Sequence, residues 1–151
     1  MPKPRHFAVQ ATSTASAAQL YALLEDAPTW CFWAGPLITR SQWEVAPGPD
    51  GIGGIRRLGH PPFMVREQIV EADPSHHHGY RMISGQPLRS YVANVHLVEV
   101  EAVAGQVAHT SVEWAGTMVA LIPGTGWLME RLLRRMIAGF ARRLATAAGP
   151  T

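Results

Sequence analysis

A series of short alternating segments fills the middle of this chain, from residue 38 to about residue 119. Turns rich in glycine and proline separate the segments, and short strands between such turns are typical of an antiparallel meander. The six predicted strands read ITRSQWEVA, IRRLGH, FMVREQIVEA, YRMISG, YVANVHLVEVE and VAHTSVEWAGTMVAL. A sheet of this size has an apolar face that the rest of the chain must cover.

Helical patterns on either side of the strands can supply that cover. Residues 126–147 are predicted to form a long helix with apolar residues at spacings of three and four. This stripe comprises Met129, Leu133, Met136, Phe140 and Leu144. Near the start, residues 5–11 alternate like a strand. A helix begins near Ser16, whose spacing to Gln19 fits a capping box, and TWCFWAG forms a second short helix. The order predicts an α+β fold.

The composition is that of a globular chain and argues against several classes of function. A chain of 151 residues, 47% of them hydrophobic, fits one domain with a sizeable core. A net charge of +2 is too weak to indicate nucleic-acid binding. The single Cys31 leaves neither an internal disulfide nor a cysteine-built metal site. No signal peptide or bilayer-spanning segment is recognisable. We therefore expect a cytoplasmic protein without stable membrane insertion, and we predict neither a cofactor nor a metal site.

Several motifs follow one another in an order that is informative as a whole. They read YALLEDAPTWCFWAGP, GIGGIRRL, REQIVEADP, YRM, QPLRSY, SVEWAG and IPGTGWLMERLL. This series resembles the helix-grip fold of the START-like (SRPBCC) superfamily, which includes the polyketide cyclase/dehydrase and Bet v 1-like families. The resemblance covers nearly the whole chain and implies a single ligand-binding domain over residues 1–151.

The resemblance also implies how the elements are arranged. A curved seven-stranded antiparallel sheet would wrap around the long C-terminal helix, with two short helices after the first strand and a hydrophobic cavity between helix and sheet. Loops near 60–62, 85–90 and 121–126 would form the mouth of the cavity. The turn that contains the histidine run SHHHGY would lie at the opposite end.

Hairpin turns set the approximate register between neighbouring strands, and the register indicates which side chains share one face of the sheet. The predicted cross-strand pairs are Arg56–Glu67, Ser84–Tyr91, Tyr80–Val95, Val95–Trp114 and Tyr91–Met118. His96 and His109 have the opposite parity and are expected to face solvent. The predicted ligand-binding set joins the inner face to the long helix and comprises Arg56, Glu67, Tyr80, Met82, Ser84, Tyr91, Val95, Val112, Trp114, Met118, Met129, Leu133 and Met136.

Each polar residue of this set has two interpretations. Arg56 and Glu67 can hold a polar head group, with Glu67 as a base, or they form a cross-strand ion pair that neutralises two charges. The ion pair is the interpretation that we favour, because such pairs are common in structural roles. Tyr80 and Tyr91 can orient a ligand or serve as wall aromatics. The catalytic candidates are Glu67, Arg56 and Tyr91.

Three further features have simpler explanations. Trp30 and Trp33 are expected to pack beneath the long helix. His76, His77 and His78 follow one another directly, so their side chains point in different directions and are not expected to chelate a metal. Five arginines of the long helix are read as a solvated face: Arg131, Arg134, Arg135, Arg142 and Arg143.

Three hypotheses of function remain open. The first is binding of an apolar or aromatic small molecule, such as a lipid, a polyketide-like compound or an isoprenoid, in the internal cavity. The second is an enzyme similar to polyketide cyclases or aromatases. The third is an interaction module resembling the ribosome- or quinone-associated members of the superfamily, which would use the arginine face.

Overall fold

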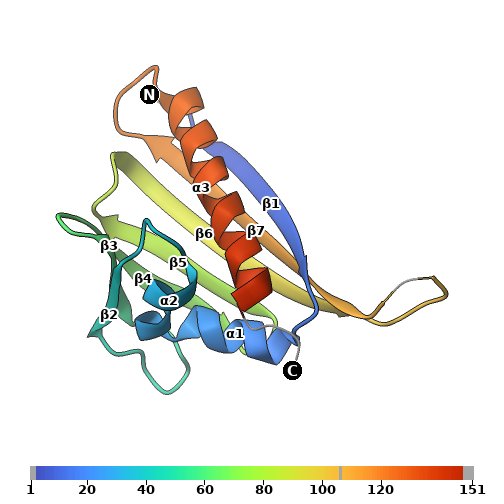
Figure 1. Cartoon of the computed structure of the whole chain (residues 1–151). Helices are drawn as coiled ribbons and strands as arrows, with labels where there is room; N and C mark the ends of the chain where they lie inside the picture. The colour runs from blue at the N-terminus through green and yellow to red at the C-terminus, as the bar shows by residue number, and fades with distance from the viewer. Residues whose placement is uncertain (1–2, 106, 148–151) are drawn as a thin grey trace.

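A seven-stranded antiparallel sheet with a long helix across one face forms the framework of the molecule (Figure 1). This computed structural model describes residues 3–105 and 107–147. The elements follow in the order β1 (Arg5–Ser13), α1 (Ala17–Glu25), η1 (Ala27–Thr29), α2 (Trp30–Trp33), β2 (Arg40–Val45), β3 (Ile55–His60), β4 (Phe63–Asp73), β5 (His77–Ser84), β6 (Leu88–Val100), β7 (His109–Ala120) and α3 (Gly126–Ala147). The predicted fold class and element order are confirmed.

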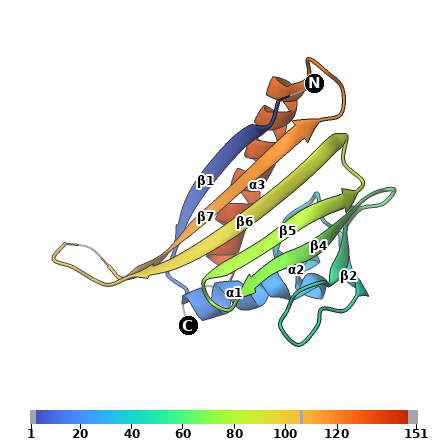
Figure 2. The ribbon, with the colours of Figure 1, turned by 180° about the vertical axis from the view of Figure 1, so that it is seen from behind.

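The strands are arranged in the order β1-β7-β6-β5-β4-β3-β2, so six strands form a continuous meander and β1 joins its far edge beside β7. Figure 2 shows the outer face of this sheet, with α3 behind it and the short helices α1 and α2 across one end. The β3–β4, β5–β6 and β7–α3 connections all lie at one end of the sheet, which we call the mouth end. The β4–β5 and β6–β7 turns lie at the other end.

Local sequence accounts for the position of α1. Ser16 is its N-cap, and its side chain accepts a hydrogen bond from the Gln19 amide, while the Gln19 side chain accepts one from the Ser16 amide. The predicted capping box is therefore confirmed. At the other end of α1, the Leu24 carbonyl accepts hydrogen bonds from Trp30 Nε1 at 3.0 Å and from Arg56 Nη1 at 3.3 Å. These bonds satisfy a helix-terminal carbonyl and attach α1 to the sheet.

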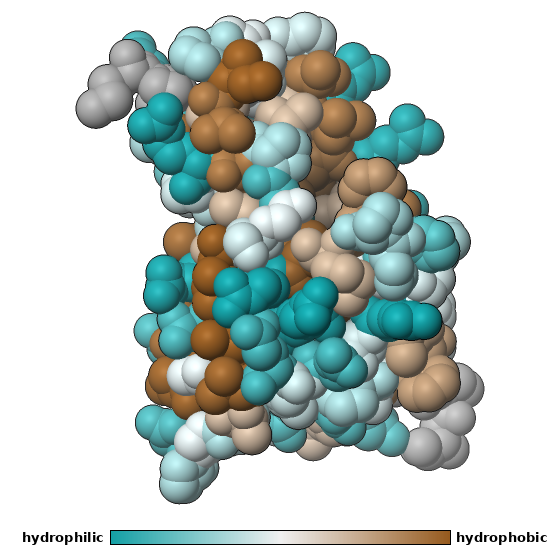
Figure 3. Space-filling view, turned by 90° about the vertical axis from the view of Figure 1, so that its left-hand side faces the viewer, coloured by the Kyte–Doolittle hydropathy of each residue, from teal (hydrophilic) through white to brown (hydrophobic). Residues whose placement is uncertain are grey.

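The core lies between α3 and the concave face of the sheet. Buried residues alternate along β7, as expected for a strand with one covered face. Trp30 and Trp33 are buried as predicted, and the Trp30 ring centroid lies 6.2 Å from that of Phe140 and 5.9 Å from that of Trp114. Apolar side chains also gather outside this core, in the upper part of the side that faces the viewer in Figure 3.

Three of the five predicted cross-strand pairs are confirmed: Arg56–Glu67, Val95–Trp114 and Tyr91–Met118. The pairing of Tyr80 with Val95 is wrong, because Tyr80 lies opposite Ala93 and His78 lies opposite Val95. The β5–β6 pairing runs only from His77 to Arg81, so Ser84 does not lie opposite Tyr91; its partner in β4, on the other side, is Arg66. A shift of two residues preserves parity, so Tyr80 still faces the core.

Gly85 explains why that hairpin is shifted. Its φ of 106° is one that favours glycine, and a Cβ atom there would clash with the Met64 carbonyl oxygen. After β5 the chain therefore passes close to the backbone of β4. A symmetric turn centred between Pro87 and Leu88 would not follow this path. The bulge in β4 between Arg66 and Glu67 lies beside this crossing.

Candidate functional site

A buried ion pair lies in the middle of the concave face. Arg56 of β3 is 0% exposed, and its Nε atom donates to Glu67 Oε1 of β4 at 2.9 Å. Burial raises the pKa of the Glu67 carboxyl above its usual value, although the Arg56 charge opposes this shift. A buried charge is stable only when its partners satisfy it, so the rest of the Arg56 environment decides what the pair can do.

Two aromatic rings enclose the Arg56 guanidinium. Its central carbon lies 4.3 Å from the ring centroid of Trp30 and 4.6 Å from that of Tyr80. These contacts come from α2 on one side and β5 on the other, and the electron-rich ring faces favour a cation between them. The arrangement fixes the plane of the guanidinium and directs its nitrogens towards Leu24, Glu67 and His78.

His78 is a member of this site that the sequence analysis missed. The predicted histidine turn is shorter than expected, because β5 begins at His77 and not at Tyr80. His78 is 1% exposed, and its Nε2 atom lies 3.2 Å from Arg56 Nη1. Its parity with Tyr80, two residues later on the same strand, was the signal that could have placed it on the inner face. His77 points elsewhere and lies 2.6 Å from Asn94 Oδ1.

The protonation state of His78 follows from its neighbours. Burial lowers its pKa well below the usual value, and the nearby charges of Arg56 and His77 act in the same direction. The neutral ring must accept at Nε2, because an arginine nitrogen can only donate. Nδ1 therefore carries the hydrogen and is a donor.

Three buried polar atoms around this point have no hydrogen-bond partner within residues 3–105 and 107–147. They are Arg56 Nη2, His78 Nδ1 and Tyr21 Oη. The ring centroid of Tyr21, in α1, lies 6.1 Å from that of His78. Burial, followed by the charges of Glu25 and Asp73, raises the pKa of Tyr21 to about 12. The site thus offers three hydrogen-bond donors without an acceptor.

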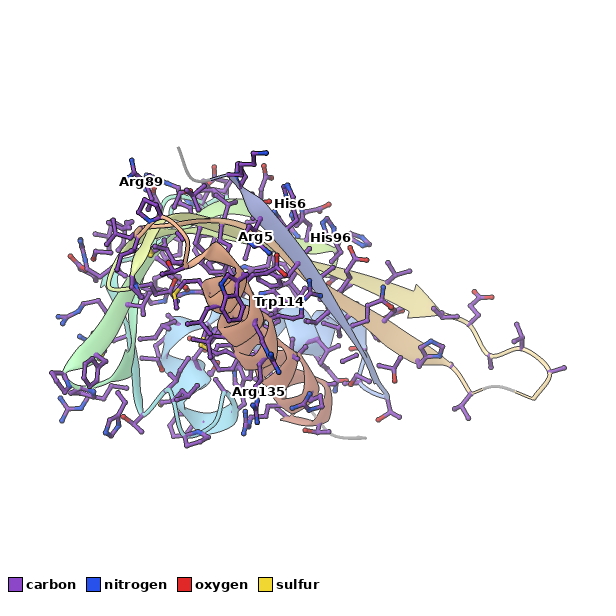
Figure 4. The ribbon with its side chains drawn as sticks, turned by 90° about the horizontal axis from the view of Figure 1, so that it is seen from above. Arg5, His6, Arg89, His96, Trp114 and Arg135 are labelled. Atoms are coloured by element: carbon purple, nitrogen blue, oxygen red, sulfur yellow. The ribbon has the colours of Figure 1, made fainter. Side chains whose placement is uncertain are left out.

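A second hydrogen-bonded group lies next to the guanidinium. Trp114 Nε1 donates to Tyr80 Oη at 3.1 Å, and the hydroxyls of Tyr80 and Tyr91 are 3.1 Å apart. Burial raises the pKa values of both tyrosines above their usual value. They are therefore protonated at neutral pH and act as donors, not as bases. Figure 4 shows Trp114 pointing from β7 towards α3.

Aromatic side chains fill the region where the cavity was expected. Trp30, Trp114, Tyr80 and Tyr91 are each at most 2% exposed and pack on Phe140 or on one another. An apolar groove of about 230 Å³ lies nearby, between the β5–β6 loop and the first half of α3. Its lining comprises Gln86, Pro87, Leu88, Met129, Leu132, Leu133 and Met136.

The structure places the predicted ligand-binding residues in three groups. The first is buried in the core and comprises Arg56, Glu67, Tyr80, Tyr91, Val95, Val112, Trp114, Met118 and Leu133. Met82, Met129 and Met136 are partly buried against that core. Ser84 is exposed at the end of β5, for the register reason given above. His96 is exposed on the outer face as predicted (Figure 4), and His109 is half-buried on the same side of β7.

The comparisons with known proteins concern the chain as a whole. Residues 4–149 match the family described as polyketide cyclase / dehydrase and lipid transport. A search of curated proteins gives no match. Within the part of the chain that the structure describes, no helix is long and apolar enough to cross a membrane.

Solved structures of similar architecture come from several bacteria. A START superfamily protein from Mycobacterium smegmatis has a TM-score of 0.77 at 14% identity, and the match covers 95% of this chain and 96% of that one. The protein XoxI from Bacillus cereus has a TM-score of 0.73 at 17% identity, with 94% of each chain covered. An uncharacterised protein from Bacillus thuringiensis has the same TM-score and identity, with 95% of this chain and 98% of that one covered. At these identities the likeness concerns the fold, which is the START-like helix-grip fold.

Proposed function

The chain belongs to the polyketide cyclase / dehydrase and lipid transport family, and from this premise we propose that it binds an apolar small molecule that carries a hydrogen-bond acceptor. The ligand would lie between α3 and the sheet, with its acceptor oxygen at Tyr21 and at one of the two other donors, His78 Nδ1 or Arg56 Nη2, which point in different directions because His78 Nε2 faces Arg56. The observation that carries this proposal is the group of three buried donors without a partner among the described residues. Unpaired buried donors are costly, and an acceptor oxygen would remove that cost.

Charge balance narrows the class of acceptor. Glu67 already neutralises Arg56 at 2.9 Å, so a carboxylate ligand would bring a second negative charge to one guanidinium. A neutral carbonyl oxygen of a ketone, ester or quinone accepts the same hydrogen bonds without that repulsion. We therefore expect a lipid, polyketide-like or isoprenoid compound with a neutral carbonyl.

The apolar groove is the proposed route to this point. Leu88 and Leu133 line the groove and also belong to the buried cluster that contains Tyr91 and Met118. Met129 and Met136 form part of the same lining, and methionine side chains adapt to ligands of different shape. A ligand that enters here would displace these flexible side chains and extend towards the Arg56 site.

A matched pair of probes tests the proposal. Calorimetric titration with 2-acetylnaphthalene should give saturable binding, while the similarly shaped 2-isopropenylnaphthalene, which lacks the carbonyl, should bind at least several-fold more weakly. The variant Tyr21→Phe removes one unpaired donor and should weaken binding of the ketone only. Tyr80→Phe is the control, because the Tyr80 hydroxyl already has partners. Equal affinities for the two probes would refute the carbonyl site, and native mass spectrometry of the purified protein would identify any ligand that remains bound.

A second candidate function is proton abstraction next to a carbonyl, favoured by the raised pKa of Glu67. A carboxylate with a raised pKa is a stronger base at neutral pH. In this reaction Glu67 would take a proton from the carbon beside the bound carbonyl, Arg56 Nη2 would donate to the enolate oxygen, and the proton would return from Glu67. Exchange of the methyl hydrogens of 2-acetylnaphthalene in D2O, followed by NMR, measures this step. Glu67→Gln should abolish exchange and retain binding; unchanged exchange would reject the role of Glu67.

A further inference from the structure

Five large apolar side chains are exposed where β7 meets α3. Two come from the connecting loop and three from the first two turns of the helix: Leu121, Ile122, Trp127, Leu128 and Leu132. Ile122 is 60% exposed and Trp127 is 58% exposed. We call these five residues the apical patch. Figure 3 shows apolar surface in this upper part of the molecule, where Figure 1 places the β7–α3 loop. Other large apolar residues are exposed elsewhere, such as Phe32 and Phe63, but these five lie close together along one loop and the helix that follows it. Contiguous apolar surface of this kind marks an interaction site.

The helix spacing explains why this surface has no partner within the molecule. Leu133 and Ile137 face the sheet and are buried. Trp127, Leu128 and Leu132 lie on the other side of the same two turns, where the described part of the chain offers no covering element. Farther along α3, the outward positions are no longer apolar and are taken by arginines, beginning with Arg134 and Arg135.

Basic residues surround the apical patch. Arg5 of β1 and Arg89 of β6 lie towards the mouth end (Figure 4), and Arg131, Arg134 and Arg135 are exposed on the first half of α3. Glu130 is the acidic residue among them, and it pairs with Arg5 at 3.2 Å and with Arg134 at 3.7 Å. Acidic residues instead occupy the far end of the sheet, including Asp50, Glu71, Asp73, Glu99 and Glu101. These acidic side chains therefore lie away from the apical patch.

We propose that the mouth end docks on the surface of a bilayer that contains anionic lipids. Tryptophan and branched aliphatic side chains enter the boundary between head groups and acyl chains, and arginines around them meet anionic head groups. A second copy of the chain would bring the same cluster of arginines against itself, so like charges oppose a dimer at this surface. An acidic protein is the remaining alternative, and the experiment below separates it from the bilayer.

The position of the groove agrees with this orientation. Leu132 belongs both to the apical patch and to the lining of the apolar groove. Docking would therefore place the opening of the groove at the bilayer surface, where apolar molecules with a carbonyl concentrate. The docking itself requires no ligand in the groove, so it can be tested independently of the proposed function.

Co-sedimentation with vesicles of phosphatidylcholine and phosphatidylglycerol (7:3) tests the proposal. We expect binding that phosphatidylcholine alone does not give and that 0.5 M NaCl removes. The variant Arg131→Gln/Arg135→Gln should lower the partition coefficient roughly 20- to 30-fold, because each basic residue contributes about fivefold near an anionic surface. The matched control is Arg142→Gln/Arg143→Gln, which removes the same charge from the far end of α3 and should retain nearly full binding. Equal loss in both variants would overturn the proposal, since only the total charge would then matter.

Tryptophan fluorescence reports the depth of the patch in the same mixture. Trp30, Trp33 and Trp114 are buried and Trp43 is partly buried against the core, so a blue shift on addition of vesicles would come chiefly from the exposed Trp127. Ile122→Ser/Trp127→Ser should abolish both the shift and the sedimentation, while circular dichroism confirms that the variant is folded. Absence of binding to the anionic vesicles overturns the proposal. The proposal is also overturned if the protein binds an acidic protein through the patch but does not bind these vesicles.

Discussion

Replacing Arg56 with methionine removes a buried cation and leaves its partners in place. The change eliminates the 2.9 Å bond to Glu67 and the bonds of Nη1 to the Leu24 carbonyl and to His78. Removing one partner of a buried ion pair costs about 3–5 kcal/mol, because the other charge stays behind without compensation. Methionine keeps most of the apolar stem of the arginine side chain, so the cost of the space left by the guanidinium is the smaller part of the effect. We expect the free energy of unfolding to fall by about 3–5 kcal/mol at neutral pH.

The pH dependence of this loss has a definite sign. Burial already raises the folded-state pKa of Glu67 and the Arg56 charge lowers it, so removing Arg56 raises that pKa further. A carboxyl whose pKa is higher in the folded state stabilises the fold below its unfolded pKa, and this stability is lost as pH rises through the folded pKa. The variant should therefore lose less stability at about pH 5 than at about pH 7.5 relative to the unmodified protein.

Urea unfolding followed by circular dichroism at both pH values measures the effect. Arg66→Met is the matched control, because Arg66 forms an ion pair of similar length, 2.7 Å, with Glu44 on the surface; the urea midpoint should barely change. The double variant Arg56→Met/Glu67→Met should recover much of the loss, since an apolar pair replaces a half-broken ionic one. If Arg56→Met costs less than about 1 kcal/mol, or costs the same at both pH values, the reasoning about a coupled buried pair is refuted.

Three further predictions concern other parts of the site. Gly85→Ala should clearly lower the urea midpoint, because the φ of Gly85 is 106° and the new methyl would meet the Met64 carbonyl. Gly105→Ala is the control and should lower the midpoint less, since Gly105 has a φ of 83° with open space around it. Equal decreases in the midpoint would count against the crossing of the chain at Gly85. The pKa of His78 is lower in the folded state, so its stabilising contribution is present above the unfolded pKa and is lost as pH falls. His78→Phe should therefore flatten the dependence of the free energy of unfolding on pH below about pH 6.5. An unchanged pH dependence would contradict the buried neutral ring. Met136→Trp should fill the groove and prevent binding of 2-acetylnaphthalene without a lower urea midpoint; unaffected binding would place the ligand route elsewhere.

The fold could be predicted because its signals are local and repeated. Strand alternation, the capping box at Ser16 and the stripe of α3 each depend on residues within a few positions of one another. The parity of Arg56, Glu67 and Trp114 followed from tight hairpins whose turn residues are easy to recognise. Parity also tolerates a shift of two residues, which is why Tyr80 was assigned to the inner face although its partner was wrong.

The site was less predictable because it depends on irregular backbone. Ser84 was assigned to the pocket on the assumption of a symmetric turn, and the crossing at Gly85 invalidates that assumption. The sequence pattern predicts a turn at His78, whereas β5 already begins at His77. The bulge in β4 between Ile69 and Glu71 shifts the pairing beside this histidine turn, and a bulge leaves no clear trace in residue alternation. Aromatic side chains fill the region where a cavity is predicted, and this packing joins residues that are far apart in the sequence, so no local pattern indicates it.

The composition of the Arg56 site bears on why it exists. A cross-strand ion pair accounts for Arg56 and Glu67, but it does not account for His78 or for the second guanidinium nitrogen, which has no partner among the described residues. A buried polar network with unpaired donors is less stable than an apolar core of the same volume, and this sheet has apolar residues such as Val95 and Val112 beside the network. Stability alone would therefore favour replacing these polar groups. Their retention at the centre of the concave face supports a role in holding a polar atom of a ligand.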